Sequence, residues 1–152
     1  MKVGFGTEIH PFTNIYCDSI GNHCTVANFV EIGGGVVIGN FCSIQAFSFI
    51  PAGVTIGDGV FIGPHVCFIN CRHPMAHRKV GTYDIEHTVV EDMVVIGAGS
   101  VIMCGVTIGK GAMIGAGSLV LNDVPAGEVF IQKREQVFYG KPISEIIEES
   151  CV

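Results

Sequence analysis

Apolar residues recur at every sixth position over most of this chain. One series runs from Ile20 to Phe68 and a second from Val90 to Val120, and every member of both is Ile, Val or Phe. A period of six fits neither the helical repeat of about 3.6 residues nor the alternation of a long strand. It predicts short strands joined by tight turns, three to a coil, with the large aliphatic side chains stacked inside a solenoid.

Two other positions of the repeat carry small residues. Glycine often follows the apolar residue, as at Gly33, Gly63 and Gly97, and we interpret it as relief of backbone strain where the chain turns. The residue four places after the apolar one is small or β-branched. Cys24 and Cys42 occupy such positions, so we expect them to fill the core.

Three segments lie outside the regular repeat. The stretch up to residue 19 is expected to form an imperfect first coil. Phe68 and Val90 are not separated by a multiple of six, so residues from about 70 to 88 are expected to leave the coil as an extruded loop. Residues from about 140 to 151 have a helix-like apolar pattern and are expected to cap the open end of the solenoid. Residues 1–152 therefore read as a single all-β domain.

Composition narrows the classes of function. The net charge of −6 argues against a nucleic-acid-binding protein, which needs clustered Lys and Arg. No apolar run approaches the roughly 20 residues of a membrane span, and the start of the chain lacks a signal-peptide pattern. The seven cysteines form no Cys-x-x-Cys pair, which favours a reducing compartment. We therefore expect a soluble, cytoplasmic protein without nucleic-acid or membrane partners.

The pattern Ile/Val-Gly-x-x-small-x resembles the hexapeptide-repeat acyltransferases. The general rule for crossover connections favours a right-handed path, whereas this resemblance implies a left-handed coil. The fold expected from it is an all-β, left-handed parallel β-helix with one extruded loop and a short C-terminal helical cap.

Two groups within that family resemble parts of the sequence. The stretches 12–16, 60–63 and 68–70 are similar to the N-acetyltransferases that act on nucleotide-linked 3-amino- or 4-amino-6-deoxyhexoses for bacterial surface glycans. Val54-Thr55-Ile56-Gly57 followed by His73-Pro74 resembles the maltose, galactoside and antibiotic O-acetyltransferases, in which the histidine of a His-Pro pair is catalytic.

Both resemblances imply acetyl-CoA as co-substrate, with no metal. They place its pantetheine arm against the backbone around Ala98 and Ala116. The basic residues left to meet the phosphates of CoA are Lys110, Lys133, Arg134 and Lys141.

His73 is the candidate catalytic residue. A sugar hydroxyl needs a general base before it can attack a thioester, and histidine is suited to that near neutral pH. An amine must only be neutral when it attacks, and His73 could then simply bind the substrate. A cysteine nucleophile at Cys71 is a weaker alternative.

Further substrate contacts are expected from polar residues near the loop and along the coil. Asn70 and Arg72 belong to the base of the loop, although Asn70 could equally be a turn residue that holds the loop. Gln45 replaces the usual Gly or Ala of the repeat. Asn14, His10 and His65 are weaker candidates, and turn chemistry or simple exposure explains each of them as well.

Several phenylalanines, including Phe29, Phe41 and Phe47, fall at positions that should face outward. Exposed aromatic side chains in such number indicate a buried subunit face. Together with the resemblance they imply a homotrimer with active sites between neighbouring subunits.

Two other classes compete with acyl transfer. A γ-type carbonic anhydrase shares this coil but holds zinc with three histidines on rigid positions, whereas His73, His77 and His87 all lie in the loop region. An ice-binding solenoid needs a flat face of repeated threonines, and the outward positions here are irregular. The sequence therefore favours N-acetyl transfer to a nucleotide-linked amino-deoxy sugar (dTDP-3-amino-3,6-dideoxyhexose type), with O-acetyl transfer to a sugar or other small alcohol, His73 acting as base, as the alternative.

Overall fold

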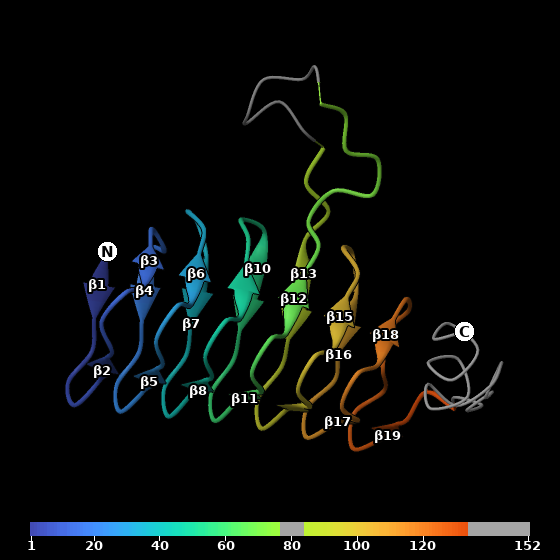
Figure 1. The fold of residues 1–152 in the computed structure, drawn as a ribbon. Helices are drawn as coiled ribbons and strands as arrows, with labels where there is room; N and C mark the ends of the chain where they lie inside the picture. Colours follow the sequence, from blue (N-terminus) through green and yellow to red (C-terminus); the bar gives the residue numbers. More distant parts are fainter. Residues whose placement is uncertain (77–83, 134–152) are drawn as a thin grey trace, which may run out of the picture.

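A computed structural model describes residues 1–76 and 84–133, which form nineteen short strands and no helix. The strands build three parallel sheets, and each turn of the chain adds one strand to each sheet (Figure 1). Sheet A contains, in order, β1 (Lys2–Val3), β4 (Ser19–Ile20), β7 (Val37–Ile38), β10 (Val54–Ile56), β13 (Thr88–Val90) and β16 (Thr107–Ile108). This arrangement confirms the parallel β-helix that the period of six predicts.

The other two sheets follow the same progression. Sheet B contains β2 (Glu8–Ile9), β5 (Thr25–Val26), β8 (Ser43–Ile44), β11 (Phe61–Ile62), β14 (Val95–Ile96), β17 (Met113–Ile114) and β19 (Val129–Phe130). Sheet C contains β3 (Asn14–Ile15), β6 (Glu31–Ile32), β9 (Phe49–Ile50), β12 (Cys67–Phe68), β15 (Val101–Ile102) and β18 (Leu119–Val120). The first three strands form the imperfect first coil expected before residue 19.

The core is the stack of apolar residues that the sequence predicts. Every member of the two apolar series, from Ile20 to Phe68 and from Val90 to Val120, is at most 2% exposed. The small positions are buried as well, and Cys24 and Cys42 lie among them. Burial raises the pKa of the Cys42 thiol to about 11, so this side chain packs as a neutral core residue.

The glycines that follow the apolar residues have a different role from the one we expected. None of Gly33, Gly63 or Gly97 has a positive φ, so relief of turn strain does not explain them. A Cβ on Gly63 would instead lie 2.7 Å from the backbone nitrogen of Ala98 in the next coil. Glycine is required because consecutive coils approach too closely for any side chain.

The positive φ angles occur two residues further along each turn. Glycine fills many of these positions, but Phe12, Phe29, Phe47 and His65 fill them at the corner between sheets B and C, with φ of 59–63°. Their rings stack along the coil axis with centroids 4.9–5.5 Å apart. Phe29 and Phe47 are 51% and 53% exposed, which confirms the predicted outward aromatic positions.

A ladder of polar side chains lines the corner between sheets A and B. Oδ1 of Asn40 accepts the Asn22 backbone N–H, Oδ1 of Asp58 accepts that of Asn40, and Oδ1 of Asp92 accepts that of Asp58. The Asp58 backbone N–H and the ammonium of Lys110 together lower the pKa of Asp92. These side chains satisfy turn amides that have no partner in the sheets.

One loop leaves this regular body between β12 and β13 and rises above the coils (Figure 1). The predicted loop therefore exists, although Thr88, placed at its end, already belongs to β13 and is buried. The cap expected at about 140–151 lies outside the described residues. Nothing in the described part of the chain is a helix long and apolar enough to cross a membrane.

Candidate functional site

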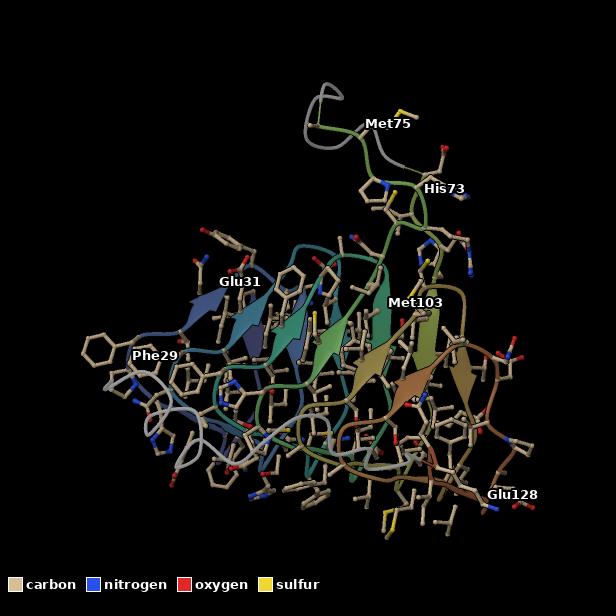
Figure 2. The ribbon with its side chains drawn as sticks, turned by 45° about the vertical axis from the view of Figure 1, so that its right-hand side comes forward. Phe29, Glu31, His73, Met75, Met103 and Glu128 are labelled. Atoms are coloured by element: carbon tan, nitrogen blue, oxygen red, sulfur yellow. The ribbon has the colours of Figure 1, made fainter. Side chains whose placement is uncertain are left out.

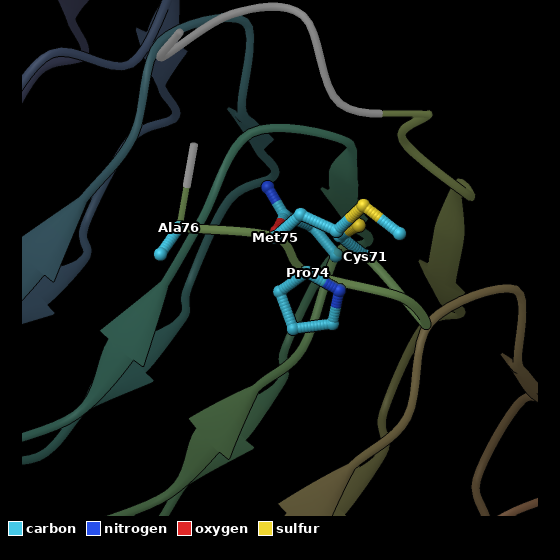
Figure 3. Close-up of a pocket in the computed structure, with 5 residues that line it drawn as sticks. Cys71, Pro74, Met75 and Ala76 are labelled. Carbon is cyan, nitrogen blue, oxygen red and sulfur yellow. The ribbon is translucent and has the colours of Figure 1, made fainter. Parts of the chain in front are cut away.

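The base of the extruded loop carries the candidate site. Asn70, Cys71, Pro74, Met75 and Ala76 surround a pocket of about 280 Å³ (Figure 3). A neighbouring pocket of about 170 Å³ shares Cys71 and Met75 with it and is also lined by Arg72, His73, Asp84 and Glu86. The loop therefore brings polar and titratable side chains together beside the coil.

His73 lies in this second pocket, on an exposed part of the loop. Figure 2 shows His73 and Met75 on the loop, raised above the strands. An exposed imidazole in this place can reach a ligand held against the loop. The structure thus places the candidate catalytic residue where a substrate has access.

Asn70 is held by the coil on which the loop stands. Its Nδ2 donates a hydrogen bond to the Ala52 carbonyl at 3.1 Å, and its backbone carbonyl accepts one from Glu86 N–H at 3.1 Å. The side chain therefore fixes the start of the loop while it also lines the first pocket.

Arg72 makes an ion pair that the sequence did not indicate. Its Nε and Nη2 donate to the two carboxylate oxygens of Glu86, both at 3.2 Å, and Nη2 also donates to the Cys104 carbonyl at 3.1 Å. This hydrogen-bonded pairing lowers the pKa of Glu86 and raises that of Arg72. Sequence reasoning missed Glu86 because no local motif marks a residue that pairs across the loop.

The remaining predicted substrate contacts lie elsewhere. His10 and Gln45 directly follow strands of sheet B, and His65 belongs to the aromatic stack at the corner between sheets B and C. Nε2 of Gln45 donates to Ser43 Oγ at 2.9 Å. Asn14 lies on sheet C, where it pairs with Glu31 of the next coil. One chain therefore does not bring these residues together with the loop.

The predicted cofactor contacts divide between two corners. Ala98 and Ala116 are exposed and lie in consecutive coils at the corner between sheets B and C. Lys110 lies at the corner between sheets A and B, with its Nζ 3.3 Å from Asp92 Oδ2. Lys133 is exposed in the last described coil, and Arg134 and Lys141 lie outside the described residues.

Within 1–76 and 84–133, no group of three His, Cys, Asp or Glu side chains is arranged to hold a metal ion. His77, one of the three loop histidines, lies outside these ranges.

The repeats match a known protein family. Residues 35–70 and 87–122 match the profile named Bacterial transferase hexapeptide (six repeats), and the gap between the two matches contains the extruded loop. Both parts of the coil that flank the loop therefore carry repeats similar to those of this family.

A curated relative is similar over part of the chain. The galactoside O-acetyltransferase of Lactococcus lactis is 41% identical over 68 residues, which are 43% of this chain and 33% of that protein. The match thus spans about a third of the relative's length.

Solved structures share the fold over longer stretches. A variant of AntD, an N-acyltransferase from Bacillus cereus, was solved with dTDP-4-amino-4,6-dideoxyglucose and coenzyme A. It matches with a TM-score of 0.69 and 24% identity over 97% of this chain and 91% of AntD. PerB from Caulobacter crescentus, solved with CoA and GDP-perosamine, matches with a TM-score of 0.61 and 20% identity over 84% of this chain and 53% of PerB. At these identities the likeness establishes the fold.

Proposed function

We propose that this chain is an acyltransferase that moves an acetyl group from acetyl-CoA to the amino group of a nucleotide-linked amino-deoxy sugar, as a step in surface-glycan synthesis. The observation that carries the proposal is the match of nearly the whole chain to AntD, whose structure holds both CoA and a dTDP-linked amino sugar. PerB, which binds CoA and GDP-perosamine, supports the same class of substrate.

The proposed reaction is direct attack within a ternary complex. The neutral amine of the sugar attacks the thioester carbonyl, a C–N bond forms, and the C–S bond breaks as the CoA thiolate leaves with the electron pair. The proton released by the amine goes to solvent or to a nearby base. His73 at the loop pocket contacts the sugar and can accept this proton.

We infer further that the working unit is a homotrimer with sites between subunits. The loop pocket lies at the corner between sheets C and A, whereas Ala98, Ala116 and Gln45 lie at the corner between sheets B and C. One chain therefore supplies only part of the proposed site at each corner. A neighbouring subunit that sets its corner against the loop would join the two. The exposed aromatic side chains supply an apolar surface for that contact.

The cysteines support a cytoplasmic protein. The six cysteines in the described residues are all free, and four of them are buried. Free thiols in this number fit a reducing compartment, where acetyl-CoA is also available.

Acetylation of a hydroxyl group is the second candidate. The galactoside O-acetyltransferase of Lactococcus lactis is similar over 43% of this chain, and His73-Pro74 resembles the pair of that group. In that reaction His73 must act as a general base, because a neutral hydroxyl is a poor nucleophile.

The test is a product assay by mass spectrometry with acetyl-CoA and a panel of acceptors. The panel contains dTDP- and UDP-linked 3-amino- and 4-amino-6-deoxyhexoses beside maltose and a galactoside. We expect one acetyl group on an amino-sugar nucleotide. Acetylation of maltose or the galactoside alone would favour the second candidate, and no transfer to any acceptor would contradict both.

The His73→Ala variant separates the two reactions, and we predict only a modest loss with an amine acceptor. A general base typically contributes about 10²–10⁴-fold, so a loss of that size would indicate hydroxyl chemistry. His23→Ala is the matched control, because His23 stacks on Phe41 at another corner and should leave the rate unchanged.

A further inference from the structure

The two ends of the extruded loop are joined by side chains. Arg72 follows β12 and Glu86 precedes β13, and they form two parallel hydrogen bonds of 3.2 Å. The pair is about 40–45% exposed, and such an ion pair alone adds little to stability. Its geometry matters more, because a two-pronged Arg–carboxylate contact fixes the orientation of both partners.

Glu86 is also seated firmly on the coil. Its backbone N–H donates to the Asn70 carbonyl at 3.1 Å, which closes the neck of the loop. Its carboxylate lies over Gly105, where a Cβ would come within 2.9 Å of Oε2. The buried Cys104 thiol also helps to lower the pKa of this carboxylate. Glu86 is thus tied both to the loop and to the core beneath it.

His73 adjoins this arrangement. It follows Arg72 directly, and its side chain lines the same pocket as Arg72 and Glu86. The orientation of the loop at His73 therefore depends on the contact that holds its neighbour.

We propose that Glu86 is a positioning residue of the candidate site: through Arg72 it holds the loop so that His73 faces the pocket. The role of His73 in this statement rests on the proposed function, whereas the positioning itself does not. The guanidinium of Arg72, which the sequence predicts to contact the substrate, donates hydrogen bonds to Glu86 and to the Cys104 carbonyl.

The first experiment measures kcat and KM of Glu86→Gln with the acceptor found in the product assay. Glutamine keeps the shape but loses the charge that orients the guanidinium. Because Glu86 acts through His73, we expect kcat to fall by up to the loss measured for His73→Ala with the same acceptor, which is modest for an amine and about 10²–10⁴-fold for a hydroxyl, while KM for acetyl-CoA stays nearly constant. Glu128→Gln is the matched control: Glu128 is an exposed carboxylate in the last described coil, far from the loop (Figure 2).

A charge swap distinguishes positioning from a general loss of folding. The double variant Arg72→Glu/Glu86→Arg restores an ion pair across the neck of the loop. We expect this double variant to recover at least part of the kcat that Glu86→Arg alone loses. A double variant no better than Glu86→Arg would overturn the proposal.

A second readout does not depend on catalysis. The imidazole NMR signals of His73 in the free protein should move in Glu86→Gln and stay in place in Glu128→Gln. If the wild-type protein acetylates nothing but these signals move, the proposed function fails and the positioning stands. If a folded Glu86→Gln protein leaves the His73 signals unmoved, Glu86 does not position His73, whatever happens to the rate.

Discussion

Two adjacent glycines in the turn after β6 have different surroundings, and they allow a test of the contact between coils. A Cβ on Gly33 would lie 2.6 Å from the Ala52 backbone nitrogen, whereas a Cβ on Gly34 would meet only the Tyr16 carbonyl at 3.9 Å. Neither glycine has a positive φ.

We therefore predict that Gly33→Ala lowers the free energy of unfolding by about 1–3 kcal/mol, as overpacking does elsewhere. Gly34→Ala should change it little. Urea unfolding followed by circular dichroism measures both, and equal effects of the two substitutions would show that coil contact does not explain this glycine.

The same glycines show what a sequence can and cannot reveal about single residues. The position of Gly33 followed from the period of six, but the reason for a glycine there did not, since the distance between coils is absent from a one-dimensional pattern. The inward Ile and Val residues were predictable because burial alone determines their identity.

Among the structural elements, the ladder of polar side chains between sheets A and B makes the stability of the fold depend on pH. The pKa of Asp92 is lowered by the Asp58 backbone N–H and by Lys110. A carboxyl whose pKa is lower in the folded state stabilises the fold at pH values above its ordinary pKa of 3.8. That contribution is lost as the pH falls through the lower pKa of the folded state.

We thus predict that Asp92→Asn lowers the melting temperature at pH 7 and that its difference from wild type shrinks below about pH 4. Thermal unfolding between pH 7 and pH 2.5 tests this. Asp18→Asn, which changes an exposed carboxylate at another corner, should track the wild-type curve. A constant difference in melting temperature between Asp92→Asn and wild type across this pH range would mean that the charge of Asp92 does not contribute to stability.

The loop could be located from the sequence but its internal contacts could not. A break in the period marks where residues leave the coil, and the outline 70–88 agrees with the strands on either side apart from Thr88. The pairing of Arg72 with Glu86 depends on how an irregular segment folds back on itself. No periodic signal encodes such a contact.

At the scale of the whole molecule, the stacked rings of Phe12, Phe29 and Phe47 bear on assembly. All three are more than half exposed in the single chain, which is unusual for a surface that meets only water. If they line the subunit contact, replacing Phe29 and Phe47 with Ser should convert the proposed trimer into smaller species.

Sedimentation velocity measures this directly. Phe5→Ser is a suitable control, because Phe5 is 81% exposed and packs against His23 outside that stack. A wild-type protein that sediments as a monomer, or a double variant that stays trimeric, would contradict the assignment of this face.

Corresponding positions in consecutive coils are commonly eighteen residues apart, as Asn22 is from Asn40 and Asn40 from Asp58. Removing eighteen residues from the regular part would leave every inward side chain above one of the same kind, because each ladder would simply lose one rung. Gene segments that encode whole coils can therefore be gained or lost without a new core. Lineages that share this architecture can change in length by duplication while the residues around the loop stay in register.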